Sequence, residues 1–560
     1  MLQQQFSTDE SLQFALAHHR DGRFAEAEAI YRQVLADDSK NPQALNLMGT
    51  LAMQTGRLPL AADLLGRAVV ARPEMASFHC NLGEAYRRME RLDDAIAHFR
   101  RAIELDPSLS MAHNNLGLAL GDRAEWQAAA EAFRAAIRIQ PGCAPFHSNL
   151  GNVLREAGEF DAAVDELGRA VELDPNSPES HNNLGVALAA QDRAEEAIGS
   201  YLRALQLNPR YGEAFSNLGN ALFTTGDYDR AVKVCRTAVS LAPDSPAAHW
   251  NLAVALLRTG NFEAGWPEHE WRLRTKLKFP VRPFTQPQWR GEPREGRTIL
   301  LHAEQGFGDG IQYVRYVKFV ADRGGRVVLE CHPELRRLFD GFPGTEQVIA
   351  RGEPLSDFDL HCPLASLPFA CRTRLETIPA DVPYLFARPN LAHSWSAKLG
   401  PSDRPRVGIV WAGNPTHPND RIRSVPLKRL APLAKANVEF HGLQKAPSAA
   451  AQAFDPAVGL RVIDHHQELT DYIDTAALIS CCDLVIAVDT SVAHLAGALG
   501  KPTWVLIPFV ADCRWLVGRT DSPWYPAMRL FRQLRRDRWD EAIDAMAHEL
   551  ANWASRFSRS

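Results

Sequence analysis

Small residues recur along the first half of the chain with a period of 34 residues. Alanines and prolines recur at the same spacing, for example at Ala27, Ala61, Pro73 and Pro107. Because Gly and Ala let two antiparallel helices approach closely and Pro marks where the second helix ends, each copy predicts a helical hairpin. One hairpin cannot bury its apolar face alone, so about eight copies, over residues 8–275, should stack into a solenoid. The glycine position of the successive copies is filled by Gly49, Gly83, Gly117, Gly151, Gly185, Gly219 and Ala253.

Two further columns follow this period, and the whole pattern resembles the tetratricopeptide repeat. An amide side chain can donate to a peptide carbonyl and accept from a peptide N–H, so an asparagine column could hold an extended peptide of any sequence. Protein O-linked N-acetylglucosamine transferases carry a similar ladder, and this resemblance implies a peptide-binding role; the alternative is that each amide only bonds the neighbouring repeat. The asparagines are Asn81, Asn115, Asn149, Asn183, Asn217 and Asn251. A companion column, expected as a polar wall near the same groove, is His79, His113, His147, His181 and His249.

The second half of the chain alternates short apolar runs with helical segments, which predicts parallel sheets with crossover helices. The runs are 298–302, 326–331, 406–411, 438–443, 483–488 and 503–507. A Pro-rich stretch, 276–296, predicts a linker before them, and the sequence LGPSDRPR separates two unequal sets. We therefore expect two Rossmann-like α/β lobes, 297–398 and 399–555, with a cleft between them. Ligands of such sheets bind beyond the carboxyl ends of the strands.

Composition narrows the class of protein without naming a substrate. Hydrophobic residues make up 46% and charged residues 23% of the chain, near the averages for globular proteins. The net charge of -5 gives no general attraction to nucleic acid or to an anionic membrane. The polar start does not resemble a secretory signal, no apolar run is long enough to span a bilayer, and the cysteines form no C-x-x-C pair. A cytoplasmic protein with reduced thiols is expected.

The sequence D-T-S-V-A-H follows the run 483–488 and opens a predicted helix. The N-terminus of a helix suits a diphosphate, because its N–H groups and dipole favour negative charge. The segment resembles the donor-binding D-T-G-x-x-H of the ADP-heptose:lipopolysaccharide heptosyltransferases, although Ser491 replaces the glycine and leaves the donor open. The resemblance implies donor binding by Asp489, Thr490, Ser491 and His494. The alternative is an Asp-capped helix with a buried histidine.

A second match to the same family follows the first strand, in H-A-E-Q-G-F-G-D-G. In that family the aspartate of a G-D pair at this place is the proposed general base, which implies this role for Asp309. An acceptor hydroxyl must lose its proton as it attacks the anomeric carbon, so a positioned carboxylate is needed. Glu304 is the reserve base. The alternative for Asp309 is a helix-capping aspartate.

Basic and amide residues on two later loops complete the expected donor site. Arg423 matches a basic residue that contacts donor phosphate in the family, and Gln444 and Lys445 follow the run 438–443. Arginine suits bidentate phosphate binding and lysine a point contact, whereas solvated surface charge is the alternative for each. The D-x-D at 357–359 precedes an apolar run instead of following a strand, and 464–466 lacks helical zinc spacing. No metal and no cofactor are predicted; the nucleotide sugar is a substrate.

Together these patterns predict an α-solenoid followed by a two-lobed GT-B domain. The resemblance implies a bacterial glycosyltransferase that moves a sugar from a nucleotide-sugar donor to a protein acceptor in the repeat groove, with inversion and without a metal. Two alternatives remain. One is a repeat-based interaction scaffold with an inactive glycosyltransferase-like domain, and the other is a transferase acting on a cell-surface saccharide. We expect no nucleic-acid partner and no membrane-spanning segment.

Overall fold

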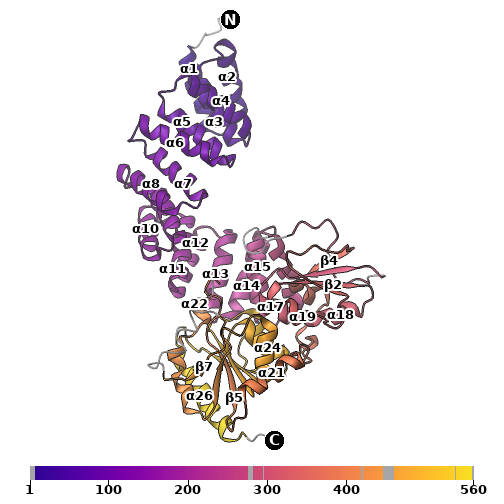
Figure 1. The fold of residues 1–560 in the computed structure, drawn as a ribbon. Helices are drawn as coiled ribbons and strands as arrows, with labels where there is room; N and C mark the ends of the chain where they lie inside the picture. The colour runs from indigo at the N-terminus through magenta and orange to yellow at the C-terminus, as the bar shows by residue number, and fades with distance from the viewer. Residues whose placement is uncertain are drawn as a thin grey trace. The chain divides into compact units, whose positions relative to one another are not determined.

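The computed structural model describes residues 7–274, 282–293, 296–417, 420–445, 459–536 and 538–557. The chain divides into two compact units, Met1–Ala221 and Leu222–Ser560, whose elements are labelled in Figure 1. The first unit contains stacked helical hairpins, and the second contains further helices followed by two parallel sheets.

The N-terminal unit repeats one hairpin of antiparallel helices. Glycine is needed at the crossing because a Cβ at Gly83 would lie 2.7 Å from Cε1 of Phe99, and one at Gly117 would lie 2.8 Å from Cε1 of Phe133. The period of small residues therefore reports helix contact, and the predicted repeats are confirmed. The helices are α1 (Thr8–Arg20), α2 (Phe24–Asp37), α3 (Pro42–Gln54), α4 (Leu58–Ala71), α5 (Ala76–Arg88), α6 (Leu92–Leu105), α7 (Ser110–Asp122), α8 (Trp126–Ile139), α9 (Ala144–Glu156), α10 (Phe160–Leu173), α11 (Pro178–Ala190), α12 (Ala194–Leu207) and α13 (Gly212–Thr225).

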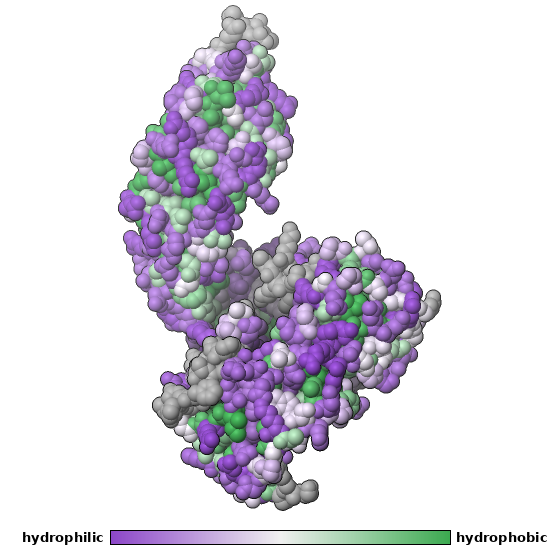
Figure 2. Space-filling model, viewed as in Figure 1, coloured by the Kyte–Doolittle hydropathy of each residue, from purple (hydrophilic) through white to green (hydrophobic). Residues whose placement is uncertain are grey.

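The surface of this unit mixes polar and apolar side chains. Phe14, Val70 and Met111 are among its exposed large apolar residues. Figure 2 shows green apolar areas scattered among the purple hydrophilic ones on the face in view. Within the described residues, no helix has the length and apolar character needed to cross a membrane.

The second unit begins with helices and a four-stranded parallel sheet in the order β3-β2-β1-β4. The predicted runs 298–302 and 326–331 are its strands β1 and β2, whereas β3 and β4 were not predicted. Its strands are β1 (Ile299–His302), β2 (Val327–Cys331), β3 (Gln347–Ala350) and β4 (Leu360–Pro363). The helices are α14 (Tyr228–Leu241), α15 (Pro246–Arg258), α16 (Phe262–His269), η1 (Glu270–Arg274), α17 (Phe307–Tyr313), η2 (Val314–Tyr316), α18 (Val317–Ala321), α19 (Pro333–Phe339), η3 (Leu364–Ser366), α20 (Leu367–Ala370) and η4 (Leu375–Thr377).

The second sheet is also parallel, with the strand order β10-β9-β8-β5-β6-β7. The four remaining predicted runs are its strands β5, β6, β8 and β9, so the expected pair of α/β lobes is confirmed. Its strands are β5 (Arg406–Val410), β6 (Glu439–Gly442), β7 (Val462–Ile463), β8 (Leu484–Val488), β9 (Thr503–Ile507) and β10 (Met528–Arg532). The helices are α21 (Pro389–Leu399), α22 (Asp420–Arg423), η5 (Leu427–Lys435), α24 (Tyr472–Ser480), α25 (Ser491–Ala498), η8 (Cys513–Trp515) and α26 (Asp540–Ser555).

The two sheets of the second unit share one apolar cluster. Leu301 and Leu329 from the first sheet, and Leu495 and Val505 from the second half, belong to the same buried group. The described part of the predicted linker also joins the first lobe, because Trp289 is fully buried and its backbone N–H donates to the carbonyl of His361 on β4 (2.8 Å). The rest of that stretch, 275–281 and 294–295, lies outside the described residues.

Candidate functional site

The loops after β1 and β8 meet where the two sheets face each other. Gly308, in the first turn of α17, packs against α25: a Cβ there would lie 2.9 Å from Cδ2 of His494 and 3.6 Å from Cα of Ser491. Only glycine fits this approach without moving the buried histidine. The structure therefore brings the predicted base, Asp309, beside the predicted donor motif.

Asp309 uses its two carboxylate oxygens differently. Its Oδ2 accepts the backbone N–H of Gly306 (3.1 Å), so the residue does cap α17. Its Oδ1 accepts a hydrogen bond from Nη2 of Arg514 (2.7 Å), a residue on the other side of the contact. Helix capping thus accounts for one oxygen of Asp309 only. The other oxygen takes part in an ion pair with a residue that follows a strand of the second sheet.

Arg514 is the group at this site that the sequence analysis missed. It lies in η8, on the loop after β9, and its side chain is 14% exposed. Nε donates to Asp512 (2.8 Å), and Nη1 donates to Gln312 of α17 (3.0 Å). Burial disfavours the charge, but Asp512 and Asp309 outweigh it and hold the pKa of Arg514 well above its usual value.

His494 is buried among aromatic and charged side chains. Burial, and secondarily the charge of Arg514, lower the pKa of His494 well below its ordinary value. Its Nε2 faces Nη1 of Arg514 (3.4 Å), so we assign the ring proton to Nδ1, which donates to the hydroxyl of Tyr525 (2.9 Å). The ring also stacks on Trp515, with centroids 5.3 Å apart. These contacts fix the side chain and favour packing over proton transfer as its role.

The start of α25 has the features of an anion site. Thr490 is the N-cap residue, and its hydroxyl is buried without a hydrogen-bond partner among the described residues. Ser491 is paired, through Oγ, with the hydroxyl of Tyr472 (2.6 Å). Burial, followed by the charge of Asp512, raises the pKa of Asp489 to about 6. A buried, unpartnered hydroxyl beside the positive end of a helix suits a phosphate group.

Two of the other residues predicted to bind the donor, Arg423 and Gln444, already have partners within the protein. Arg423 pairs with Asp420 (3.4 Å), and a Cβ at Gly413 would lie 2.7 Å from its Nη2. Arg423 therefore lies against the loop that follows β5. The amide of Gln444 is used on both sides by the backbone of Ala412 (3.2 and 3.0 Å).

Lys445 is also engaged away from the motif, because its Nζ donates to the carbonyl of Thr470 (2.5 Å). The D-x-D residue Asp359 accepts the backbone N–H of Thr298 (2.7 Å), which gives this carboxylate a role in holding the start of β1.

Glu304, the reserve base, is bound into a buried cluster. Its Oε1 accepts from Nη2 of Arg272 (2.8 Å), whose side chain is fully buried in η1 and also bonds Glu270 and Ser366. Burial raises the pKa of Glu304. The cluster joins the last repeat helices to the β1 loop, and it leaves Asp309 as the better placed carboxylate.

The asparagine column is tied to the preceding repeat. Nδ2 of Asn81 donates to Asn46 (2.9 Å), Nδ2 of Asn149 donates to Asn114 (3.0 Å), and the same direction holds for the others described. The remaining pairs are Asn115 with Sγ of Cys80 (3.6 Å), Asn183 with Ser148 (3.2 Å) and Asn217 with Asn182 (3.0 Å). Asn251 lies on α15 in the second unit. The side chains are half-buried, and the carbonyl oxygen of Asn115 also accepts a hydrogen bond from Nδ2 of Asn114 (3.1 Å).

The histidine column has a structural explanation. Nε2 of His147 pairs with the carbonyl of Pro141 (3.0 Å), six residues earlier, and Nδ1 with Glu166 (2.7 Å). The same contact to a proline carbonyl is made by His79, His113, His181 and His249. The histidines therefore hold the turns between repeats.

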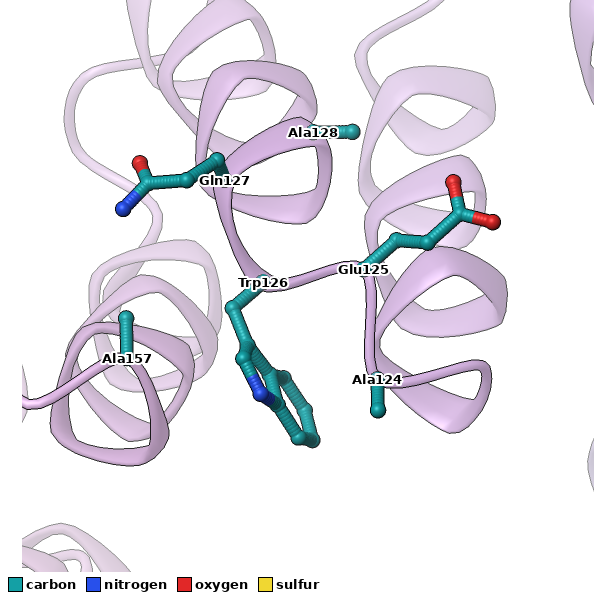
Figure 3. A pocket seen from close by; sticks show the side chains of 6 residues that line it. All are labelled: Ala124, Glu125, Trp126, Gln127, Ala128 and Ala157. Carbon is teal, nitrogen blue, oxygen red and sulfur yellow. The ribbon is translucent and has the colours of Figure 1, made fainter.

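A shallow pocket in the N-terminal unit involves none of the predicted site residues. It lies at the start of α8, where the indole of Trp126 projects between the ends of neighbouring helices (Figure 3). Its lining is Ala124, Glu125, Trp126, Gln127, Ala128 and Ala157. Half of its lining residues are alanines.

Comparison with known families agrees with helical repeats followed by an α/β region. Residues 12–76 match the tetratricopeptide repeat family, and residues 76–265 match the C-terminal domain family of cilia and flagella-associated protein 70. Residues 470–506 match glycosyltransferase family 9 (heptosyltransferase), a stretch that includes the D-T-S-V-A-H motif. The molecule is a tetratricopeptide-repeat protein with a glycosyltransferase family 9-like C-terminal region, and its two parallel sheets are consistent with a two-lobed GT-B domain.

Individual relatives cover parts of the chain. Protein FlbA of Caulobacter vibrioides is 26% identical over 321 residues, which are 52% of each chain, so this chain spans about half the length of the curated relative it matches. The structure of YrrB, "a TPR protein with an unusual peptide-binding site", is 25% identical, covering 33% of this chain and 96% of that one, with a TM-score of 0.29. MamA is 28% identical, covering 29% and 94%, with a TM-score of 0.27.

Proposed function

We propose that this protein transfers a sugar from a nucleoside-diphosphate sugar to a protein acceptor held by the repeats, with inversion and without a metal. The observation that carries the proposal is the close packing of Gly308, the neighbour of Asp309 in α17, against Ser491 and His494 at the start of α25. A base and a diphosphate site must stand on opposite sides of the anomeric carbon, and two facing lobes allow that arrangement.

The chemistry uses groups already in place. Asp309 takes the proton of the acceptor hydroxyl, whose oxygen bonds to the anomeric carbon. The bond from that carbon to the diphosphate breaks, and its electron pair leaves with the diphosphate. The start of α25 and Arg423 supply positive charge that stabilises the departing diphosphate. In metal-dependent transferases a divalent ion supplies this charge. One displacement of this kind inverts the anomeric centre.

A protein acceptor is supported by the repeats. Tetratricopeptide repeats bind proteins, and the asparagine column offers half-buried carbonyl oxygens at repeat spacing. Because Nδ2 of the five asparagines from Asn81 to Asn217 already donates one hydrogen bond, these amides are held in a fixed orientation before an acceptor arrives. An ordered row of acceptors for peptide N–H groups suits an extended chain of any sequence.

Thr490→Val tests the donor site without disturbing the fold. The Thr490 hydroxyl has no partner among the described residues, so its loss should leave the thermal midpoint of the full chain unchanged or higher. Calorimetric titration with ADP, GDP, UDP, CDP and dTDP should show at least one that binds, and the variant should bind it several-fold more weakly. Asp489→Ala combined with His494→Ala should weaken it further. Unchanged affinity in both variants would reject the assignment of the donor site.

A further inference from the structure

Arg514 joins the two sheets of the C-terminal unit through a single side chain. Two of its nitrogens donate to α17, to Asp309 (2.7 Å) and Gln312 (3.0 Å). Nε donates to Asp512 on its own loop (2.8 Å), and Nη1 lies 3.4 Å from His494 of α25. A guanidinium with partners on both sides of the contact can respond to a ligand that enters there.

In the structure this arginine is paired with the proposed base. One oxygen of Asp309 accepts the Gly306 N–H and the other accepts Arg514, so both already have donors. An acceptor hydroxyl that approaches Asp309 therefore meets one oxygen engaged by a backbone N–H and the other engaged by a guanidinium. The base must lose this partner before it can receive a hydroxyl proton.

A diphosphate at α25 would compete for the same guanidinium. Nη1 of Arg514 lies 3.4 Å from Nε2 of His494, which is within one turn of the start of α25. There the Thr490 hydroxyl is buried, with no hydrogen-bond partner in the described part of the chain. The planar fork of arginine fits phosphate oxygens in a bidentate way, and a diphosphate brings more charge than one carboxylate. We therefore expect Arg514 to interact more strongly with a bound diphosphate than with Asp309.

We propose that Arg514 changes partners when the donor binds, moving from Asp309 to the diphosphate and so freeing the base. This inference rests on the proposed function. Asp309 then accepts the proton of the acceptor hydroxyl as the oxygen bonds to the anomeric carbon. The electron pair of the broken bond goes to the diphosphate, which Arg514 now neutralises. Donor binding precedes activation of the acceptor, and the base stays masked while the donor site is empty.

Calorimetry on the full chain with inorganic pyrophosphate and the nucleoside diphosphates named above measures this exchange. Arg514→Gln should weaken binding roughly tenfold or more, because a charged hydrogen-bonding pair is lost. Asp309→Asn should instead tighten binding several-fold, since the competing carboxylate is gone. In the double variant that gain should shrink to the small effect of removing one nearby negative charge. A merely structural role for Arg514 predicts no such tightening.

Two controls keep the result interpretable. Arg514→Lys keeps the charge and, with a thermal melt of each variant, separates misfolding from lost binding. Arg519→Gln removes a loop arginine paired with Asp521 and should leave affinity unchanged. If Asp309→Asn has the same effect with and without Arg514, or none, the exchange is wrong. Weakening by Thr490→Val with no effect of Arg514→Gln rejects the exchange but keeps the donor site; no binding of any probe to the wild type rejects both.

Discussion

Replacing Asn183 separates the two roles that the asparagine column could play. Its Nδ2 donates to Oγ of Ser148 in the preceding repeat (3.2 Å), so Asn183→Ala removes a bond between repeats as well as any contact to a peptide. Ser148→Ala removes the same bond and leaves the amide in place. The two variants therefore differ in what remains for an acceptor.

The expected magnitudes follow from that one bond. Both side chains are half-buried, so its loss should cost about 0.5 to 1.5 kcal/mol of stability in either variant. A peptide contact of the same kind is worth a similar amount, which is roughly a two- to tenfold change in acceptor affinity. Changing Asn115, Asn149 and Asn183 together should enlarge the effect, since neighbouring repeats contribute separately.

The assay compares transfer with hydrolysis. Labelled-sugar incorporation into protein and release of nucleotide from the donor alone are measured for wild type and each variant, well below the thermal midpoint. Both single variants should lower the melting temperature alike, only Asn183→Ala should lower incorporation, and neither should change hydrolysis. Equal loss of incorporation in Ser148→Ala and Asn183→Ala would show that the column only holds the repeats together.

Three further results are expected. Gly117→Ala should destabilise the repeats by about 1 to 3 kcal/mol in chemical unfolding, because the Cβ would crowd Phe133, whereas Gly142→Ala, with open space around it, should be neutral. Because folding raises the pKa of Asp489 to about 6, stability from this carboxyl is present in acid and lost as pH rises through that value, so Asp489→Asn should raise the melting temperature more at about pH 7.5 than at about pH 4.5. Excess chelator should leave nucleotide-sugar turnover unchanged; abolished turnover would mean that a metal takes part.

The repeats could be predicted because their cause is local and periodic. Five successive copies, from Gly49 to Gly185, place a glycine against one large side chain of the same hairpin, such as Gly185 against Tyr201, where a Cβ would lie 2.6 Å from the ring. Buried strands such as β8 also show as unbroken apolar runs. Strands β3 and β4 were missed because their sequences interrupt the apolar run: β3 begins with an exposed glutamine, and β4 contains a histidine and ends in a proline.

Contacts between distant residues could not be predicted. Arg514 pairs with Asp309 from 205 positions away, and nothing near it in the sequence marks that partner. The direction of a side chain is equally hidden: Gln444 follows a strand as expected, yet its amide serves the backbone of Ala412. The positions of the motifs after the strands predicted which loops lie close together. Which of their side chains face the site depends on packing, which the sequence does not show.

Turnover of a panel of nucleotide sugars by wild type and Asp309→Asn tests the central claim most directly. Wild type should release nucleoside diphosphate from at least one donor, faster with a protein acceptor present. Asp309→Asn should be slower by about 10²- to 10⁴-fold while still binding the diphosphate, and Glu304→Gln, assayed in parallel, should keep its turnover if it is stably folded. No release from any donor, or near-wild-type turnover in Asp309→Asn, would contradict the account.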